Sequence, residues 1–261
     1  MGLWQKIKTF LVVYYAYMVE YRAELLFWVL SGSLPIILMG VWIEAAQGGQ
    51  FTLDPLTFAR YFIMVFIVRQ FTLVWVIWEF EKEVVQGKLS LKLLQPIDPV
   101  WHHVAAHLSE RLARLPFVVV LIVLFFWLYP QAFWSMSLGQ FLLGCLATGL
   151  AFSLRFLLQY TLAILAFWTE RASALEDLFF LFYLFLSGYL APLEVFPPLM
   201  QEIAQWTPFP YLLYFPVALF IGLPVSVGRG FLTLLVWGGV LLGLNRWLWR
   251  KGLRKYSGMG A

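Results

Sequence analysis

Apolar runs of membrane-spanning length are the feature of this sequence that most constrains its fold. Several stretches reach the roughly 20 residues that an α-helix needs to cross about 30 Å of hydrocarbon. None of them alternates as the strands of a membrane β-barrel do. Apolar residues make up 62% of the 261 and charged residues only 12%, which is far from the balance of a soluble domain. We predict an all-α polytopic membrane protein, with a single membrane domain over residues 1–261.

The runs predict six transmembrane helices, and the basic residues orient them. With these spans, most of the 18 Lys and Arg residues fall on one side, and both termini share that side. The positive-inside rule makes this side cytoplasmic. The net charge of +4 is thereby assigned to membrane topology, and we predict no nucleic-acid partner. The spans lie at approximately 25–44, 57–79, 115–133, 138–168, 176–191 and 229–249.

Two segments flanking the spans have patterns of their own. Residues 1–24 place Ile7, Phe10 and Tyr14 at helical spacing, which predicts an amphipathic helix on the inner leaflet or, alternatively, an extension of the first span. Residues 191–228 hold more than half of the 13 prolines, and proline disfavours helix in the residue before it. We therefore predict broken re-entrant helices on the outer side rather than a seventh span.

A cytoplasmic segment at 80–112 separates the second and third predicted spans. Gly87 permits a sharp turn there, and a short leucine-rich stretch follows. Prolines end this stretch. A short helix that carries leucines outside the bilayer fits either a cleft on a soluble partner or the lipid surface, and the two readings stay open. The leucines are Leu89, Leu91, Leu93 and Leu94, and the prolines are Pro96 and Pro99.

The sequence offers little for catalysis. His103 and His107 have a spacing that zinc can use, but no acidic residue lies between them as in H-E-x-x-H. We predict no metal site, no catalytic residue and no cofactor in this chain, and we expect pH-sensitive or interfacial histidines. No G-x-x-x-x-G-K-[ST] motif occurs, so any ATP and Mg must be bound by a partner. Cys145 is the one cysteine, which excludes an intrachain disulfide.

Polar and small residues within the spans identify further candidates. Arg69 and Arg155 are costly in hydrocarbon, so each should face protein or water. Both are candidates for the substrate pathway. A structural bond to neighbouring carbonyls is the alternative for Arg69, and snorkelling to a phosphate is another role for Arg155. Gly239 and Gly243 form a G-x-x-x-G surface, which serves either packing within the chain or dimerisation.

The stretch "EKEVVQGKLSLKLLQPIDPVWHHVAAHL" resembles the segment after the second span of type-2 ABC export permeases. In that family this segment is the coupling helix, which seats in a groove of the ATP-binding subunit. The later stretch "SGYLAPLEVFPPLMQEIAQWTPFPYLLYFPVALFIG" is placed like the outer re-entrant helices of the family. The resemblance implies that the residues coupling to the ATPase are Glu83, Gly87, Leu89, Leu93, Leu94 and Pro96.

The resemblance also implies a function and partners. The chain would be the permease subunit of an ATP-driven exporter in a bacterial cytoplasmic (inner) membrane, with an ABC ATP-binding subunit and a second permease chain. The subgroup with "GKLSLKLLQPIDP" favours a heterodimer over a homodimer. Arg69 and the aromatic residues of the second and fifth spans are expected to line the pathway, and a lipid-like or amphipathic substrate is expected. A membrane scaffold and a polytopic lipid-modifying enzyme are the alternatives.

Overall fold

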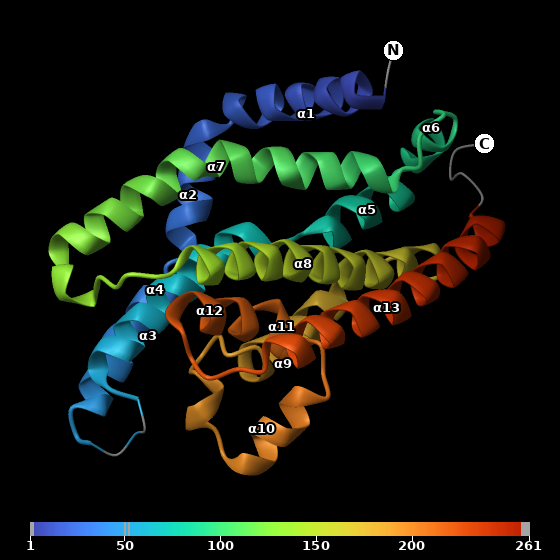
Figure 1. Ribbon diagram of the computed structural model, residues 1–261. Helices are drawn as coiled ribbons and strands as arrows, with labels where there is room; N and C mark the ends of the chain where they lie inside the picture. The colour runs from blue at the N-terminus through green and yellow to red at the C-terminus, as the bar shows by residue number, and fades with distance from the viewer. Residues whose placement is uncertain (1–2, 50, 52, 257–261) are drawn as a thin grey trace.

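The computed structural model describes residues 3–49, 51 and 53–256. Every regular element in these ranges is a helix (Figure 1), which confirms the all-α prediction for the described residues. The α-helices are α1 (Leu3–Glu20), α2 (Arg22–Ser31), α3 (Leu34–Ala46), α4 (Pro55–Thr72), α5 (Val76–Val85), α6 (Leu89–Leu93), α7 (Val100–Leu128), α8 (Leu138–Ala163), α9 (Ala174–Leu186), α10 (Pro198–Gln205), α11 (Phe209–Leu212), α12 (Tyr214–Ile221) and α13 (Val227–Lys255). Short 3-10 helices lie at η1 (Pro130–Ala132), η2 (Ile164–Phe167) and η3 (Leu193–Val195).

Membrane-spanning length is reached by five helical segments among the described residues. They are Arg22–Ala46, Pro55–Val85, Val100–Leu128, Leu138–Phe167 and Val227–Lys255. The fifth predicted span, 176–191, corresponds to α9, which has 13 residues and so covers only about 20 Å. Helix length therefore does not confirm the count of six spans.

Helix α4 lies at the centre of the bundle. It contacts α3, α7, α8 and α12, and Phe58, Tyr61, Phe62 and Val65 on it are fully buried. A helix that is apolar on all sides belongs in the interior. Asp54 precedes the helix and Pro55 occupies its first position, where the missing N–H of proline costs no hydrogen bond. The centre of the molecule is thus one buried helix enclosed by four others.

Two predicted spans have different boundaries in the structure. The predicted span at 57–79 lies within Pro55–Val85, a segment of membrane-spanning length, but residues 73–75 separate its two helices, α4 and α5. The third predicted span, 115–133, begins much earlier, since α7 runs without interruption from Val100 through Pro116 to Leu128. Helix α7 packs beside the break in the second span and supplies it with hydrogen bonds.

The N-terminal segment forms a helix, α1, that lies beside α7 (Figure 1). The Tyr14 hydroxyl is 3.0 Å from His102 Nδ1, and Ser109 Oγ donates to the Leu11 carbonyl at 3.0 Å. Phe10 and Tyr14 of the predicted apolar face are half-buried, while Ile7 of the same face and Val12, Val13 and Tyr17 on the remaining surface are exposed. Residues 1–2 of the predicted helix lie outside the described residues.

The proline-rich region 191–228 consists of short helices, as predicted. They are η3, α10, α11 and α12, and none reaches spanning length. Gly222 ends α12 with φ of 76°, a left-handed conformation that glycine adopts without steric cost. Figure 1 shows the start of α1, helix α6 and the end of α13 toward one end of the molecule, with α10 away from them.

Candidate functional site

The predicted cytoplasmic segment folds into an elbow, which we define as α5, the turn 86–88, α6, the loop 94–99 and the start of α7 (residues 76–103). Gly87 has φ of 71°, so the sharp turn predicted at this glycine is confirmed. Its N–H donates to the Val84 carbonyl at 3.2 Å. Pro96 lies in the loop after α6, and Pro99 is the N-cap of α7. The turn and the prolines together hold α6 across the ends of two longer helices.

Charged side chains tie the three helices of the elbow together. Glu83 on α5 forms an ion pair with Lys92 on α6. His103 on α7 is only 3% exposed, and its two ring nitrogens lie 3.3 Å from Glu79 Oε2 and 3.4 Å from Glu83 Oε2. Ion pairs withdrawn from water hold their geometry more firmly than surface pairs do. The elbow is therefore braced as one unit, with Glu83 at its centre.

The leucines of α6 divide into two sets. Leu89 is fully buried and packs in a core of α5, α8 and α13 side chains. Leu91 and Leu94 are 67% and 85% exposed, and Leu93 is 37% exposed. The prediction that these leucines face outward together is wrong for Leu89. Leu91 and Leu94 form the outward surface of the elbow.

The break at 73–75 is bridged by side chains of α7. Arg111 donates through Nε to the Phe71 carbonyl and through Nη2 to the Leu73 carbonyl. The N–H of Trp75 donates to His107 Nε2 at 3.2 Å, and His107 Nδ1 is 2.8 Å from the His103 carbonyl. Backbone groups freed by a broken helix need such partners where water is scarce. These contacts connect the central helix α4 to the elbow.

Arg111 is a site residue that the sequence did not single out. Its guanidinium is buried and also stacks on Phe152 at 4.0 Å. An available signal was the i, i+4 spacing of His107 and Arg111 on an apolar helix, which places both on one face. The position of the break itself, in "TLVWV", carries no glycine or proline.

The histidines have structural partners. His102 contacts Tyr14 of α1, while His103 and His107 are buried in the elbow and beside the break. The expectation of pH-sensitive or interfacial histidines stays a prediction. Within the part of the chain that the structure describes, no group of three or more His, Cys, Asp or Glu side chains is arranged to hold a metal ion.

Arg69 and Arg155 meet on one aromatic cluster. Arg69 lies in the last turn of α4, over the Tyr189 ring at 5.1 Å, and its Nη1 is 3.5 Å from the Gly32 carbonyl. Arg155 lies over the Tyr183 ring at 4.3 Å, and the Tyr183 and Tyr189 rings are 5.8 Å apart. Arg155 is 1% exposed, so it does not snorkel to a lipid phosphate. The structure brings the two arginines to a shared buried cluster, and their role in a pathway stays a prediction.

The G-x-x-x-G surface faces outward. A side chain added at Gly239 or Gly243 would meet no other part of the described chain within 4 Å. Packing against a helix of the same chain is therefore not what these glycines serve. Gly252, farther along α13, does allow close packing within the chain, because an added Cβ would collide with the Phe167 ring.

An apolar groove of about 670 Å³ lies between α4, α7 and α8. Its wall includes Phe126, Phe141 and Phe152, and Arg111 lies at its margin together with Leu108. Neither Arg69 nor Arg155 lines it. The largest apolar cavity described and the predicted pathway arginines are thus separate features.

The comparisons with known proteins agree with this architecture. The model of the ABC-2 family transporter protein matches residues 46–260, which include the elbow and the short helices of 191–228. No curated protein and no solved structure matches the chain. Because the family model covers well over half of the chain, this multi-pass membrane protein belongs to the ABC-2 transporter family.

Proposed function

We propose that this chain is the membrane subunit of an ATP-driven exporter. Two permease chains would lie over two ATP-binding subunits, which bind ATP and Mg, because this chain has no phosphate-binding motif of its own. Membership of the ABC-2 transporter family supports the association with an ATP-binding subunit. Closure of the ATP-binding subunits would move the elbow and, through it, the membrane helices.

The observation that carries this proposal is the exposed surface of α6. Leu91 and Leu94 are the most exposed leucines of the elbow, yet they stand on a segment that Gly87 and the Glu83–Lys92 pair hold in place. A rigid apolar projection suits docking into a groove of a partner. A push on α6 would reach α7 through His103 and then the α4–α5 break through His107 and Arg111.

The proposed topology places both termini and the elbow in the cytoplasm of a bacterial cell. Helix α9 then has to return the chain to the outer side before α13 begins. Its 13 residues do not cover the hydrocarbon, but the backbone that follows is shielded, since Ser187, Tyr189 and Ala191 are at most 2% exposed. Non-helical backbone at membrane depth is tolerated where protein covers it. The sixth crossing would thus combine α9 with buried non-helical chain.

The second permease chain is proposed to contact α13. Gly239 and Gly243 lie on a face of this helix that no described residue of the chain covers, and small residues allow helices to approach closely in membranes. Val236 and Val240 are exposed on the same helix. A heterodimer remains the favoured form on the basis of the resemblance described above.

An amphipathic, lipid-like molecule is the proposed substrate. The groove between α4, α7 and α8 offers about 670 Å³ of mainly aromatic and aliphatic surface, and the Arg111 guanidinium lies at its margin. An acyl chain would match the apolar wall, while a polar head would find the cation.

Affinity purification from native membranes tests this proposal. Wild-type protein should co-purify with an ATP-binding subunit and a second permease, and ATP hydrolysis should accompany the complex. The double variant Leu91→Glu/Leu94→Glu should lose the ATP-binding subunit, because charges would enter an apolar contact. Leu199→Glu is the matched control, since Leu199 is 68% exposed on α10, away from the elbow. A wild-type complex without an ATP-binding subunit would refute the exporter, and a partner without ATP turnover would favour a scaffold.

A further inference from the structure

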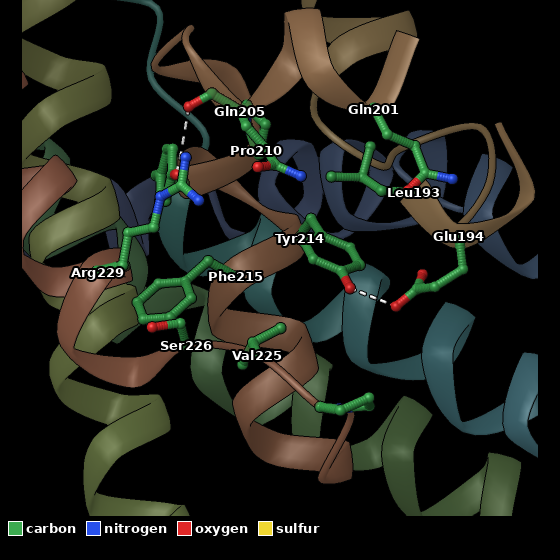
Figure 2. A pocket seen from close by; sticks show the side chains of 13 residues that line it. Leu193, Glu194, Gln201, Gln205, Pro210, Tyr214, Phe215, Val225, Ser226 and Arg229 are labelled. Carbon is green, nitrogen blue, oxygen red and sulfur yellow. Dashed lines mark hydrogen bonds between the residues drawn. The ribbon is translucent and has the colours of Figure 1, made fainter. Parts of the chain in front are cut away.

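A second cavity, of about 310 Å³, lies among η3, the short helices α10 to α12 and the start of α13. This outer pocket differs from the apolar groove because charged and polar side chains line it. Figure 2 shows Glu194 and Arg229 on opposite sides, with Tyr214 and Phe215 between them. Its volume is at the lower end of the roughly 300–1,000 Å³ of small-molecule sites.

The acidic side of the pocket carries a carboxylate that has no ion-pair partner in the described chain. The Tyr214 hydroxyl donates to Glu194 Oε1 (Figure 2). The other oxygen, Oε2, is buried and has no hydrogen-bond partner. A buried carboxylate oxygen without a donor is costly. Burial and the adjacent Glu194 raise the pKa of Tyr214, so its hydroxyl stays protonated and keeps the carboxylate oriented.

The basic side of the pocket carries an arginine that is also unpaired within the described chain. Arg229 is exposed, and within the described part of the chain its guanidinium has neither a hydrogen bond nor an ion pair. It lies in the first turn of α13, whose N-cap Ser226 also lines the pocket and makes no side-chain cap. A guanidinium next to the free N–H groups of a helix start favours a phosphate.

Helix α10 lies along the pocket. Gln201 and Gln205 line the cavity, while Leu199, Ile203 and Trp206 are 68%, 51% and 75% exposed. Ala204 is the buried residue of this helix, and the acidic Glu202 is exposed beside the apolar side chains. Such an amphipathic helix suits the headgroup layer of a membrane, where apolar side chains meet lipid and polar side chains meet water.

The position of the pocket along α13 sets its depth in the membrane. Arg229 and Arg250 are 21 positions apart on one continuous helix, which corresponds to about 32 Å. This distance matches the roughly 30 Å of a bilayer's hydrocarbon core. When the basic end of α13 lies at one headgroup layer, Arg229 and the pocket lie at the headgroup layer opposite.

We propose that the outer pocket binds a zwitterionic phosphoethanolamine group, with its phosphate at Arg229 and its ammonium at Glu194. The ammonium would bring a positive charge and N–H donors to the Glu194 carboxylate, which has no ion-pair partner in the described chain. A choline group has no N–H to donate, so it would form no hydrogen bond with this carboxylate. The same chemistry occurs in a lipid headgroup and in a free phosphoethanolamine ester. This inference rests on the membrane placement of α13 and is independent of ATP coupling.

Titration of the purified full-length protein tests the pocket. Short-chain phosphatidylethanolamine is the probe, with phosphatidylcholine and phosphatidylglycerol of the same chain length for comparison and soluble phosphoethanolamine to separate the two sources. We expect saturable binding of the ethanolamine lipid, about tenfold tighter than that of either other lipid. Binding of the soluble ester as well would indicate recognition of the headgroup alone, and binding of the lipid only would indicate that the acyl chains contribute.

Variants connect binding to the two charges. Glu194→Gln and Arg229→Gln should each weaken binding about tenfold or more, whereas Glu202→Gln, on the exposed side of α10, should not change it. Arg229 is exposed and packs on nothing essential, so its variant stays folded even if Glu194→Gln does not. Equal affinity for all three lipids, or unchanged binding by Arg229→Gln, would overturn the proposal. Neither result bears on whether an ATP-binding subunit co-purifies.

Discussion

The elbow and the outer pocket use similar charged residues for opposite purposes. In the elbow, Glu83 is held between Lys92 and His103. In the outer pocket, neither Glu194 nor Arg229 has an ion-pair partner in the described chain. Ion pairs within a chain brace its structure, whereas unpaired charges on a cavity wall are candidates for binding a ligand. The comparison thus separates the part that would transmit motion from the part that would bind a molecule.

Replacing one arginine in each region should show the largest contrast. Arg111→Met leaves the Phe71 and Leu73 carbonyls at the α4–α5 break without their side-chain donor, and we expect a loss of roughly 3 kcal/mol in the free energy of unfolding. Arg229→Met should change it by no more than about 0.5 kcal/mol. Unfolding in mixed detergent micelles measures both. If both variants lost the same free energy of unfolding, the elbow and the outer pocket would not differ in the way proposed.

Two leucines of α6 sharpen the description of the elbow. Leu89→Ala removes a fully buried side chain and should cost about 2–3 kcal/mol. Leu91→Ala, at a position that is 67% exposed, should leave the isolated chain within about 0.5 kcal/mol of wild type but weaken its association with the ATP-binding subunit. The same unfolding measurement, paired with co-purification, distinguishes a core leucine from a docking leucine. A stable Leu89→Ala protein would contradict the assignment.

The turns of the two regions provide a third contrast. Gly87 and Gly222 have φ of 71° and 76°, so alanine at either position should cost about 1–2 kcal/mol. Only Gly87→Ala should also reduce association with the ATP-binding subunit, because only that turn orients α6. Thermal unfolding and co-purification of both variants check this expectation. Equal loss of the ATP-binding subunit in the two variants would mean that general destabilisation, not the elbow, is responsible.

Replacing one glutamate in each region with glutamine should have the smallest effect on the free energy of unfolding. Glu83→Gln weakens contacts to Lys92 and His103 and should lower the free energy of unfolding by about 1 kcal/mol. Glu194→Gln, measured without lipid, should leave it unchanged or raise it slightly, since the amide is cheaper to bury than the charge. Chemical unfolding at fixed detergent composition is sensitive enough for this pair. A larger loss at Glu194 would argue that its role is structural.

Local sequence accounts for a large part of the fold. Apolar runs predict the long helices because satisfying backbone hydrogen bonds within one segment is the way to cross hydrocarbon. Glycine at position 87 predicts the turn, and the prolines of 191–228 predict short helices, since both effects arise within a few residues. The same reasoning could not divide the leucines of α6, because which of them is buried depends on α5, α8 and α13.

The sequence by itself determined the class of this protein, its charge bias and the turn at Gly87, because these depend on residue type and spacing. The tertiary structure alone decided the break at 73–75, the role of Arg111 and the meeting of Glu194 with Arg229 across one cavity. Each of these joins residues far apart in the chain, 35 positions for Glu194 and Arg229 (229 − 194). No local pattern encodes such contacts, since they form only when packing brings separate helices together.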